Sequence, residues 1–179
     1  MKLKTHYIFS TGIITVIDKS FTSFYLAFLI ALVISFMGKI IIDKIGHKKR
    51  YTKYGKIPIR TPVTHTFSRS IMWGFLASTI VMIPFYLTSR IAFLSIIIIS
   101  GIVVGPSHMF LDSFTGAGIF VKKGNKWKRF SILHLRYNNE MANGIAIFAG
   151  ISLILISLMD YNLFFISFHF LMNYFYHVL

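Results

Sequence analysis

The stretch IAFLSIIIISGIVVGPSHMFL, residues 91–111, runs for 21 positions without an Asp, Glu, Lys or Arg. An α-helix rises about 1.5 Å per residue and must cover about 30 Å of hydrocarbon to cross a bilayer, so this stretch is long enough to span one. Four more stretches of 19 or 20 residues are equally free of these residue types: 20–38, 70–89, 141–159 and 161–179. The sequence therefore predicts five membrane-crossing helices.

The overall composition excludes an ordinary water-soluble domain. Hydrophobic residues make up 55% of the 179 positions and charged residues only 13%, against about 25% charged residues in a typical soluble domain. Cysteine is absent, so disulfides and thiolate ligands are excluded. Residues 5–17 form a shorter uncharged segment, which is expected to be a sixth crossing or a re-entrant arm. No small-residue cleavage site follows it, which argues against a signal peptide.

Basic residues fall mainly in two segments between the apolar stretches. Residues 39–69 contain nine Lys and Arg against one acid, and residues 122–140 contain six against one acid. The positive-inside rule predicts that both segments are cytoplasmic loops. With helices near 5–17, 20–43, 66–89, 91–112, 141–159 and 161–178, both termini are then expected on the cytoplasmic side. The expected fold is an all-α, polytopic membrane bundle of five to six helices in a single domain, residues 1–179.

The net charge of +14 has two interpretations. Basic loops next to a membrane are explained by attraction to anionic lipid headgroups, and they can also hold a phosphate-bearing substrate. Nucleic acid is not expected as a partner, because the basic residues form no separate domain and the tyrosines beside them also suit a membrane interface. Membrane lipids are the expected partners. The sequence does not predict the oligomeric state.

Two histidine–aspartate pairs stand out because the chain has only five acidic residues. Asp43 and His47 are four residues apart, as are His108 and Asp112, and such positions share one face of a helix. The topology places both pairs at the cytoplasmic ends of their helices, although it was assigned without them. Pro106, which follows Gly105, precedes the second pair and is expected to break the helix that contains His108 and Asp112. Imidazole and carboxylate groups together are suitable ligands for a divalent cation.

Two further histidines are expected in the same layer. His65 lies where the first basic loop re-enters the membrane, and His6 lies one turn into the first segment. The remaining histidines, His134, His169 and His177, are interpreted as interfacial residues without a ligand role.

The motifs resemble those of a known family. Thr5-His6, the segment from Asp43 to His47, Arg60-Thr61-Pro62-Val63-Thr64-His65-Thr66 and the segment from Ser107 to Gly116 occur in the order found in the YdjM-like family of membrane-bound metal-dependent hydrolases, and in particular in its archaeal branch. The resemblance covers roughly residues 1–145. It implies a metal-dependent hydrolase. A single Asp43 stands where many members carry an Asp-rich turn.

The leading functional hypothesis is a membrane-bound hydrolase of an ester or phosphoester, with a phospholipid or another amphiphile as substrate. The expected ligands of a divalent metal, with zinc as first choice, are His65, His108, Asp112, Asp43 and His47. Asp43 or His6 is expected to act as the catalytic base, because a metal-bound water must lose a proton to become a nucleophile. Arg60, Lys48 and Lys49 are expected to bind the substrate phosphate.

Two alternatives stay open at this point. In the first, the chain is a non-catalytic scaffold, partner-binding or envelope protein in which the histidine–aspartate pairs are hydrogen bonds between helices. In the second it is a transporter with its substrate site at Gly105-Pro106, although the other half of the chain lacks a matching broken helix.

Overall fold

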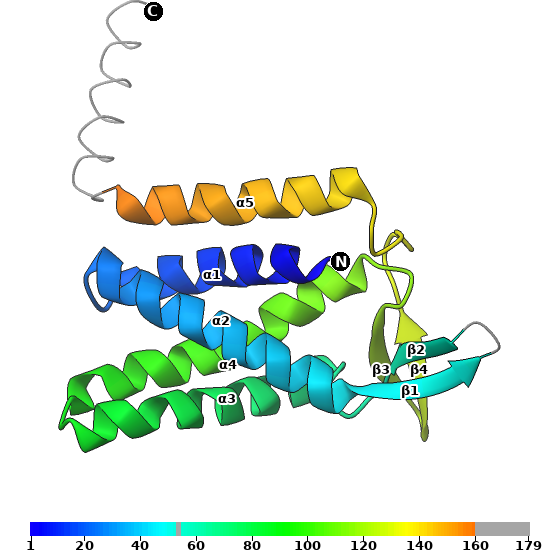
Figure 1. Ribbon diagram of the computed structural model, residues 1–179, viewed down its shortest axis with the longest axis horizontal. Coiled ribbons are helices and arrows are strands. Elements are labelled where there is room, and N and C mark those ends of the chain that lie inside the picture. Colours follow the sequence, from blue (N-terminus) through cyan, green and yellow to red (C-terminus); the bar gives the residue numbers. More distant parts are fainter. Residues whose placement is uncertain (53–54, 160–179) are drawn as a thin grey trace, which may run out of the picture.

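The computed structural model describes residues 1–52 and 55–159. Its helices run side by side as a bundle (Figure 1), with the bounds α1 Leu3–Lys19, α2 Phe24–Gly46, α3 Phe67–Leu87, α4 Leu94–Ser113 and α5 Glu140–Leu158. A short 3₁₀ turn, Ile91–Phe93, leads into α4. The fold is mostly helical, as the hydropathy pattern predicts. The helix predicted near 161–178 lies outside the described residues.

Four of these helices are long and apolar enough to cross a membrane: α2, α3, α5, and α4 together with its 3₁₀ turn. Their outward faces are apolar as well. Only 22% of the apolar window of α5 is buried inside the protein, and Phe148 on this helix is 73% exposed. A water-soluble protein would not present such faces to solvent. These helices therefore indicate an integral membrane protein.

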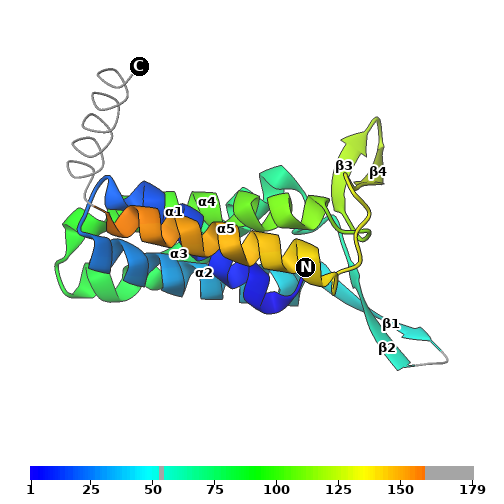
Figure 2. The same cartoon turned by 90° about the horizontal axis from the view of Figure 1, so that it is seen from above.

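Polar side chains line the buried face of helix α1, as they also do on α4. Thr5, His6, Ser10, Thr11 and Thr15 are all at most 3% exposed. In both views of the bundle α1 lies against α5 (Figures 1 and 2), and Ser10 is hydrogen-bonded to Ser107 of α4 at 2.7 Å. Because other helices cover it, α1 can carry polar groups that a lipid-facing helix could not.

Small residues allow the helices to pack closely. Gly101 and Gly105 of α4 lie against Ser70, Gly74 and Ser78 of α3, and a Cβ atom on either glycine would overlap this neighbouring helix. Both sets repeat every four residues, the spacing that brings membrane helices into close contact. Helix α4 continues through Pro106 to Ser113, so the break expected at Gly105-Pro106 is wrong. The close contact with α3 at Gly101 and Gly105 directly precedes the proline.

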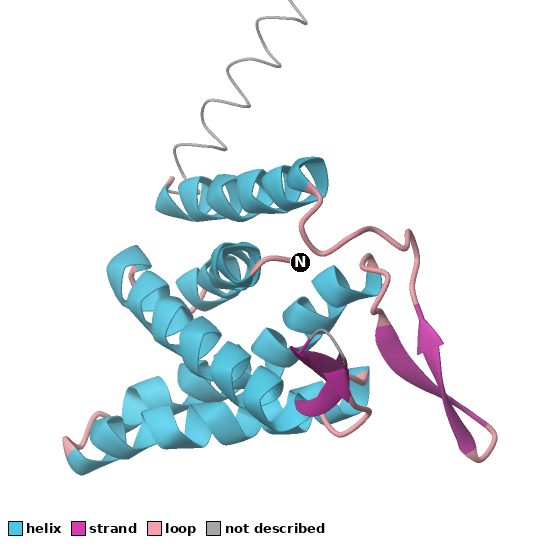
Figure 3. Cartoon of the chain, turned by 45° about the vertical axis from the view of Figure 1, so that its right-hand side comes forward, coloured by secondary structure: helices cyan, strands magenta, loops and turns pink. Residues whose placement is uncertain are grey.

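Both basic loops contain β-hairpins, which the all-α prediction did not include. Strand β1 (His47–Thr52) pairs with β2 (Gly55–Arg60), and β3 (Ile119–Lys123) pairs with β4 (Lys126–Phe130). Both hairpins extend from the same end of the bundle (Figures 2 and 3). The many Lys and Arg residues led to the prediction of both segments as loops, and the alternation of Ile57 and Ile59 in β2 was not used as a strand signal.

The helix limits differ from the predicted ones by a few residues. Helix α2 starts at Phe24 and not at residue 20, because the chain turns at Ser20. It ends at Gly46, so His47 is the first residue of β1 and does not lie in the helix with Asp43. Helix α3 begins after Thr66, whose side chain accepts a hydrogen bond from the Arg69 amide at 3.2 Å, a common way to begin a helix.

Candidate metal centre

Histidine and aspartate side chains from separate elements meet at the end of the bundle that carries the hairpins. His6 comes from the first turns of α1, Asp43 from the last turn of α2, and His65 from the loop before α3; His108 and Asp112 come from the last turns of α4. His6, His65, His108 and Asp112 are at most 1% exposed. The structure thus brings together the residues predicted to form one polar layer.

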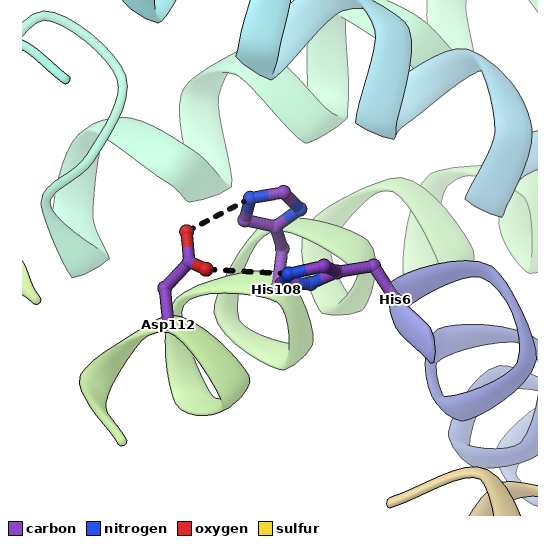
Figure 4. A group of neighbouring side chains, drawn as sticks. All are labelled: His6, His108 and Asp112. Atoms are coloured by element: carbon purple, nitrogen blue, oxygen red, sulfur yellow. Dashed lines mark ion pairs between the residues drawn. The ribbon is translucent and has the colours of Figure 1, made fainter. Parts of the chain in front are cut away.

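Asp112 lies at the centre of this group. Its Oδ2 atom lies 3.1 Å from His108 Nε2, and its Oδ1 atom lies 3.2 Å from His6 Nε2 (Figure 4). The rings of His6 and His108 stack with a centroid distance of 4.2 Å. One carboxylate therefore contacts both imidazoles through different oxygen atoms.

Arg60 fixes the orientation of this carboxylate. Its Nη2 donates to Asp112 Oδ1 at 2.6 Å, and its Nη1 donates to Thr115 Oγ1 and to the Gly118 carbonyl, each at 3.0 Å. The β1–β2 hairpin brings Arg60 into position, because Arg60 pairs with His47 at the base of the hairpin. Since Arg60 occupies Oδ1, the Oδ2 atom of Asp112 is left facing His65 and His108.

Asp43 faces the same point from α2. Its Oδ1 atom lies 3.6 Å from His108 Nε2 and 3.9 Å from His65 Nε2. His65 Nε2 also lies 3.8 Å from Asp112 Oδ2. The other Asp43 oxygen, Oδ2, accepts from Lys39 one turn earlier. Like Asp112, Asp43 has one oxygen bound to a cationic side chain and one oxygen aimed at the histidines.

Four atoms at this point, and both ring nitrogens of His6 beside it, make no well-aligned hydrogen bond among the residues that the structure describes. The four are His65 Nε2, His108 Nε2, Asp43 Oδ1 and Asp112 Oδ2, although His108 Nε2 and Asp112 Oδ2 lie within ion-pair distance of each other. Buried polar atoms in proteins are nearly always paired, so four together need an explanation. Two ligands at neighbouring positions on one metal ion, each bound at about 2.0–2.2 Å, lie about 3.0–3.6 Å apart. The four separations of 3.1, 3.6, 3.8 and 3.9 Å are close to this range.

The tautomer of His65 follows from its neighbour Thr64. The Thr64 hydroxyl donates to the Ile42 carbonyl at 2.9 Å and lies 2.8 Å from His65 Nδ1. A hydroxyl has one proton, so Thr64 must accept from an Nδ1–H group of His65. Burial lowers the pKa of His65 to about 3, so the ring is neutral near pH 7. Its Nε2 therefore carries a lone pair, which faces two carboxylate oxygens.

Gly46 allows the Thr64-His65 segment to approach α2. A Cβ atom at position 46 would overlap Thr64 Oγ1 and the ring of His65. The backbone amide of Thr61 donates to the Gly46 carbonyl at 2.8 Å and closes the base of the hairpin. Any larger residue at position 46 would push His65 away from the two carboxylates.

His47 lies beside the four atoms and forms a second group with Asp43 and His65. One ligand atom from each of these three residues lies within 4.8 Å of the others. The Nδ1 atom of His47 is hydrogen-bonded to the backbone carbonyl of Asp43 at 2.8 Å. Because a carbonyl only accepts, this nitrogen carries a proton, and Nε2 is the atom of His47 that can bind a metal.

A cavity of about 970 Å³ opens next to Asp43 and His47. Basic side chains from several elements line it: Lys39, Lys44, Arg60 and Arg129. Of the residues predicted to bind a phosphate, Arg60 lines the cavity and also binds Asp112. Lys48 is exposed and is not among the described lining residues. Lys49 is the third residue of β1.

Sequence reasoning missed the roles of two residues that shape the site, Thr64 and Arg129. Lys39 was a candidate partner of Asp43, because it lies one helical turn before it, and the structure shows this ion pair. Thr64 precedes His65 directly, but the tautomer follows only once the Ile42 carbonyl is located. The position of Arg129 at the cavity could not be predicted from sequence spacing, because it depends on the folding of a hairpin.

Comparison with known proteins identifies the family. Residues 1–111 match the family described as "Protein of unknown function (DUF1286)". No curated protein and no solved structure matches the chain. The matched segment contains α1 to α3, the first hairpin and most of α4, so it includes every candidate ligand except Asp112, which follows it directly.

This match overturns the resemblance to the YdjM-like hydrolases. The motifs behind that resemblance are short, and they consist of the His, Asp, Thr and Gly residues that many polar sites at helix ends require. The function must therefore be argued from the site itself. With residues 1–111 matched, which is more than half of its length, the chain belongs to the DUF1286 family of proteins of unknown function.

Proposed function

We propose that the protein is a membrane-bound, metal-dependent hydrolase that acts on an ester or phosphoester of an amphiphile. One observation carries the metal site: the lone pair of His65 Nε2, whose tautomer Thr64 fixes, faces the unpaired oxygens of Asp43 and Asp112 at 3.9 and 3.8 Å. Without a cation, these three electron-rich atoms repel one another in a buried site. A divalent cation between them turns the repulsion into coordination.

The set of donors favours zinc. Imidazole nitrogens and carboxylate oxygens are donor types that zinc binds, and a water would take a fifth position beside the four protein ligands, while six oxygen ligands would favour magnesium or calcium. His65, His108, Asp43 and Asp112 are the proposed ligands. His6 and His47 lie just outside them, where they can orient a ligand or accept a proton.

Hydrolysis needs a nucleophile, a proton acceptor and a place for the substrate. A divalent cation held by these residues would lower the pKa of a bound water to about 7 and so supply a nucleophile for the carbonyl carbon or the phosphorus. In the overall reaction the ester bond would break, and the leaving alkoxide would take up the proton that the water had lost. Asp43 is the proposed proton acceptor among the ligands, because its side chain is 28% exposed and lines the cavity. The basic lining of the cavity suits an anionic headgroup.

We infer that the site lies at the cytoplasmic face. Both hairpins are rich in Lys and Arg and extend from the end of the bundle that holds the site. The positive-inside rule assigns this end to the cytoplasm. On this inference the amino terminus is cytoplasmic, and the chain crosses the membrane five or six times.

The alternative of a non-catalytic scaffold receives less support from the site. A structural role requires the histidine and aspartate atoms to bind one another through hydrogen bonds. Instead, four of these atoms make no well-aligned hydrogen bond among the described residues, although two of them, His108 Nε2 and Asp112 Oδ2, lie 3.1 Å apart. Leaving buried polar atoms without good hydrogen bonds is costly.

Elemental analysis tests the metal site. The wild type, His108→Ala and Asp112→Asn are purified in detergent and analysed for zinc, manganese and iron by mass spectrometry. We expect about one metal per wild-type chain and a large loss in both variants. His134→Asn is the matched control, because His134 is exposed and has a φ of 51° that asparagine tolerates. Equal metal content in all four proteins would refute the site.

Activity is tested separately. Wild-type protein is incubated with phosphatidic acid and with p-nitrophenyl acyl esters in mixed micelles. A chelator should abolish any turnover, and added zinc should restore it. Metal bound at the site without turnover of either substrate class would support a metal centre and contradict the proposed reaction.

A further inference from the structure

A second pocket is lined by residues of α1, α4 and α5 and adjoins the basic cavity at Met1. Its volume is about 300 Å³, at the lower end of the range of small-molecule sites. Every described lining residue is apolar; they include Phe9 of α1, Phe110 of α4, Leu135 and three alanines of α5. Such a lining suits hydrocarbon, because it has no polar side chain that could bind an ion or a sugar.

The shape of the pocket follows from residue size along α1 and α5. The two helices touch at Gly12 and Gly150, where a Cβ atom on either glycine would overlap the backbone of the other helix. Towards the site, Ala142, Ala146 and Ala149 of α5 leave space beside Phe9. The stretch from Ala142 to Ala149 covers about 10 Å along the helix at 1.5 Å per residue. The glycine contact follows directly after Ala149, and Met1 lines the pocket near Asp112.

Two residues that line the pocket lie next to the site. Met1 lines both the apolar pocket and the basic cavity, and Leu111 lines the pocket next to Asp112 in the sequence. Phe110 and Ile145, which also line the pocket, are 47% and 60% exposed. The outward face of α5 is a lipid-facing surface, so hydrocarbon can reach the pocket from the side.

We propose that this pocket holds the acyl chain of an anionic amphiphile whose headgroup occupies the basic cavity. This proposal rests on the proposed function, because the pocket and the basic cavity meet at Met1, whose amino group lies 3.8 Å from Asp112 Oδ1 of the metal centre that would cleave the ester. An acyl chain is favoured over a second protein segment because the pocket adjoins a cavity lined by Lys39, Lys44, Arg60 and Arg129. Apolar and basic sites in contact match a molecule with one hydrocarbon end and one anionic end.

Photolabelling of metal-free protein tests the pocket independently of catalysis. The full chain in detergent micelles is treated with a chelator, incubated with lysophosphatidic acid that carries a diazirine near the end of a palmitoyl chain, and irradiated. Labelled peptides are mapped by mass spectrometry. We expect labels on α1 around Phe9 and on α5 between Ala142 and Ala149. Unlabelled lysophosphatidic acid should compete, whereas glycerol phosphate at the same concentration should not.

Two variants narrow the pocket at different positions, Ala142→Phe and Ala149→Leu. Leu155→Phe is the control, because Leu155 is exposed on the same helix and is not among the described lining residues. If a larger side chain excludes two methylene groups of the acyl chain from the pocket, binding weakens by about tenfold. Labelling at low probe concentration should therefore fall about tenfold in the two variants and remain unchanged in the control. The melting temperature of each variant confirms that it is folded.

Other outcomes would overturn the proposal. Labels spread over outward residues such as Phe148, equal labelling in the narrowed variants, or a lack of competition by unlabelled lipid would each show that the pocket holds no acyl chain. Because no metal is present, these results are independent of catalysis. A labelled pocket in a protein that never binds metal would support the pocket and refute the proposed function.

Discussion

The hydroxyl group of Thr64 sets the tautomer of His65. It donates to the Ile42 carbonyl at 2.9 Å and so accepts from His65 Nδ1 at 2.8 Å. The opposite ring nitrogen is then left without a proton, and it faces Asp43 and Asp112. A residue that touches no proposed ligand atom thus decides whether His65 can bind a metal.

Loss of this hydroxyl should weaken metal binding. Thr64→Val keeps the size of the side chain but lets His65 adopt either tautomer, and loss of a hydrogen bond that orients a ligand typically lowers metal affinity by about 10–100-fold. Thr64→Ser retains the hydroxyl and should bind metal nearly as well as the wild type. Competition titration with a zinc indicator measures both affinities. Equal weakening in both variants would point to packing as the cause.

Removal of Arg60 should destabilise the protein. Arg60→Met leaves Asp112 Oδ1 without its 2.6 Å hydrogen bond to Nη2, and breaking one side of a buried ion pair costs about 3–5 kcal/mol. Because the Arg60 side chain is 13% exposed, we expect a loss near the lower end of that range. Denaturant titration in detergent measures it. Lys122→Met, at an exposed position of β3, is the control and should change stability little.

The contact between α1 and α5 should not tolerate a methyl group. Gly12→Ala places a Cβ atom against the Gly150 carbonyl, and forcing helices apart typically costs about 1–3 kcal/mol. Gly144→Ala on α5 has open space around the new atom and should be neutral or stabilising, since alanine favours helix more than glycine. Thermal unfolding compares the two. A Gly12→Ala protein as stable as Gly144→Ala would contradict the close contact.

The pH dependence of stability should reflect the burial of His65. Burial lowers its pKa to about 3 from its usual 6.5, so the unfolded chain binds a proton between these values that the folded chain does not. The contribution of His65 to stability is therefore complete above pH 6.5 and is lost as the pH falls towards 3. In chelator-treated protein, the melting temperature of the wild type should fall more steeply over this interval than that of His65→Asn. Parallel curves would place His65 in contact with water.

The helices and the polar layer could be predicted from the sequence because each depends on local patterns. Apolar stretches of spanning length identified four helices that the structure contains, and the alternation of basic and apolar segments placed Asp43, His65, His108 and Asp112 at one end. His6 joined them because α1 starts at the same end. These inferences needed only chain direction and helix length.

The detailed site could not be predicted because it depends on contacts between distant residues. Arg60 reaches Asp112 only when the β1–β2 hairpin folds, and the many basic residues of that segment led to its prediction as a loop. The pairing of Thr64 with the Ile42 carbonyl depends on how the loop packs against the end of α2. The family was predicted wrongly for a related reason, since short motifs describe the chemistry of a site without identifying the ancestry of the chain.

The order of the ligands along the chain has a consequence for assembly in the cell. His6 and Asp43 leave the ribosome well before His108 and Asp112, which lie at the end of α4. The proposed site can close only after α4 has entered the membrane, so metal loading would be a late step of biogenesis. The chain has no cysteine and so no disulfide. One bound cation would then link the ends of helices that enter the membrane at different times, as a disulfide does in other proteins.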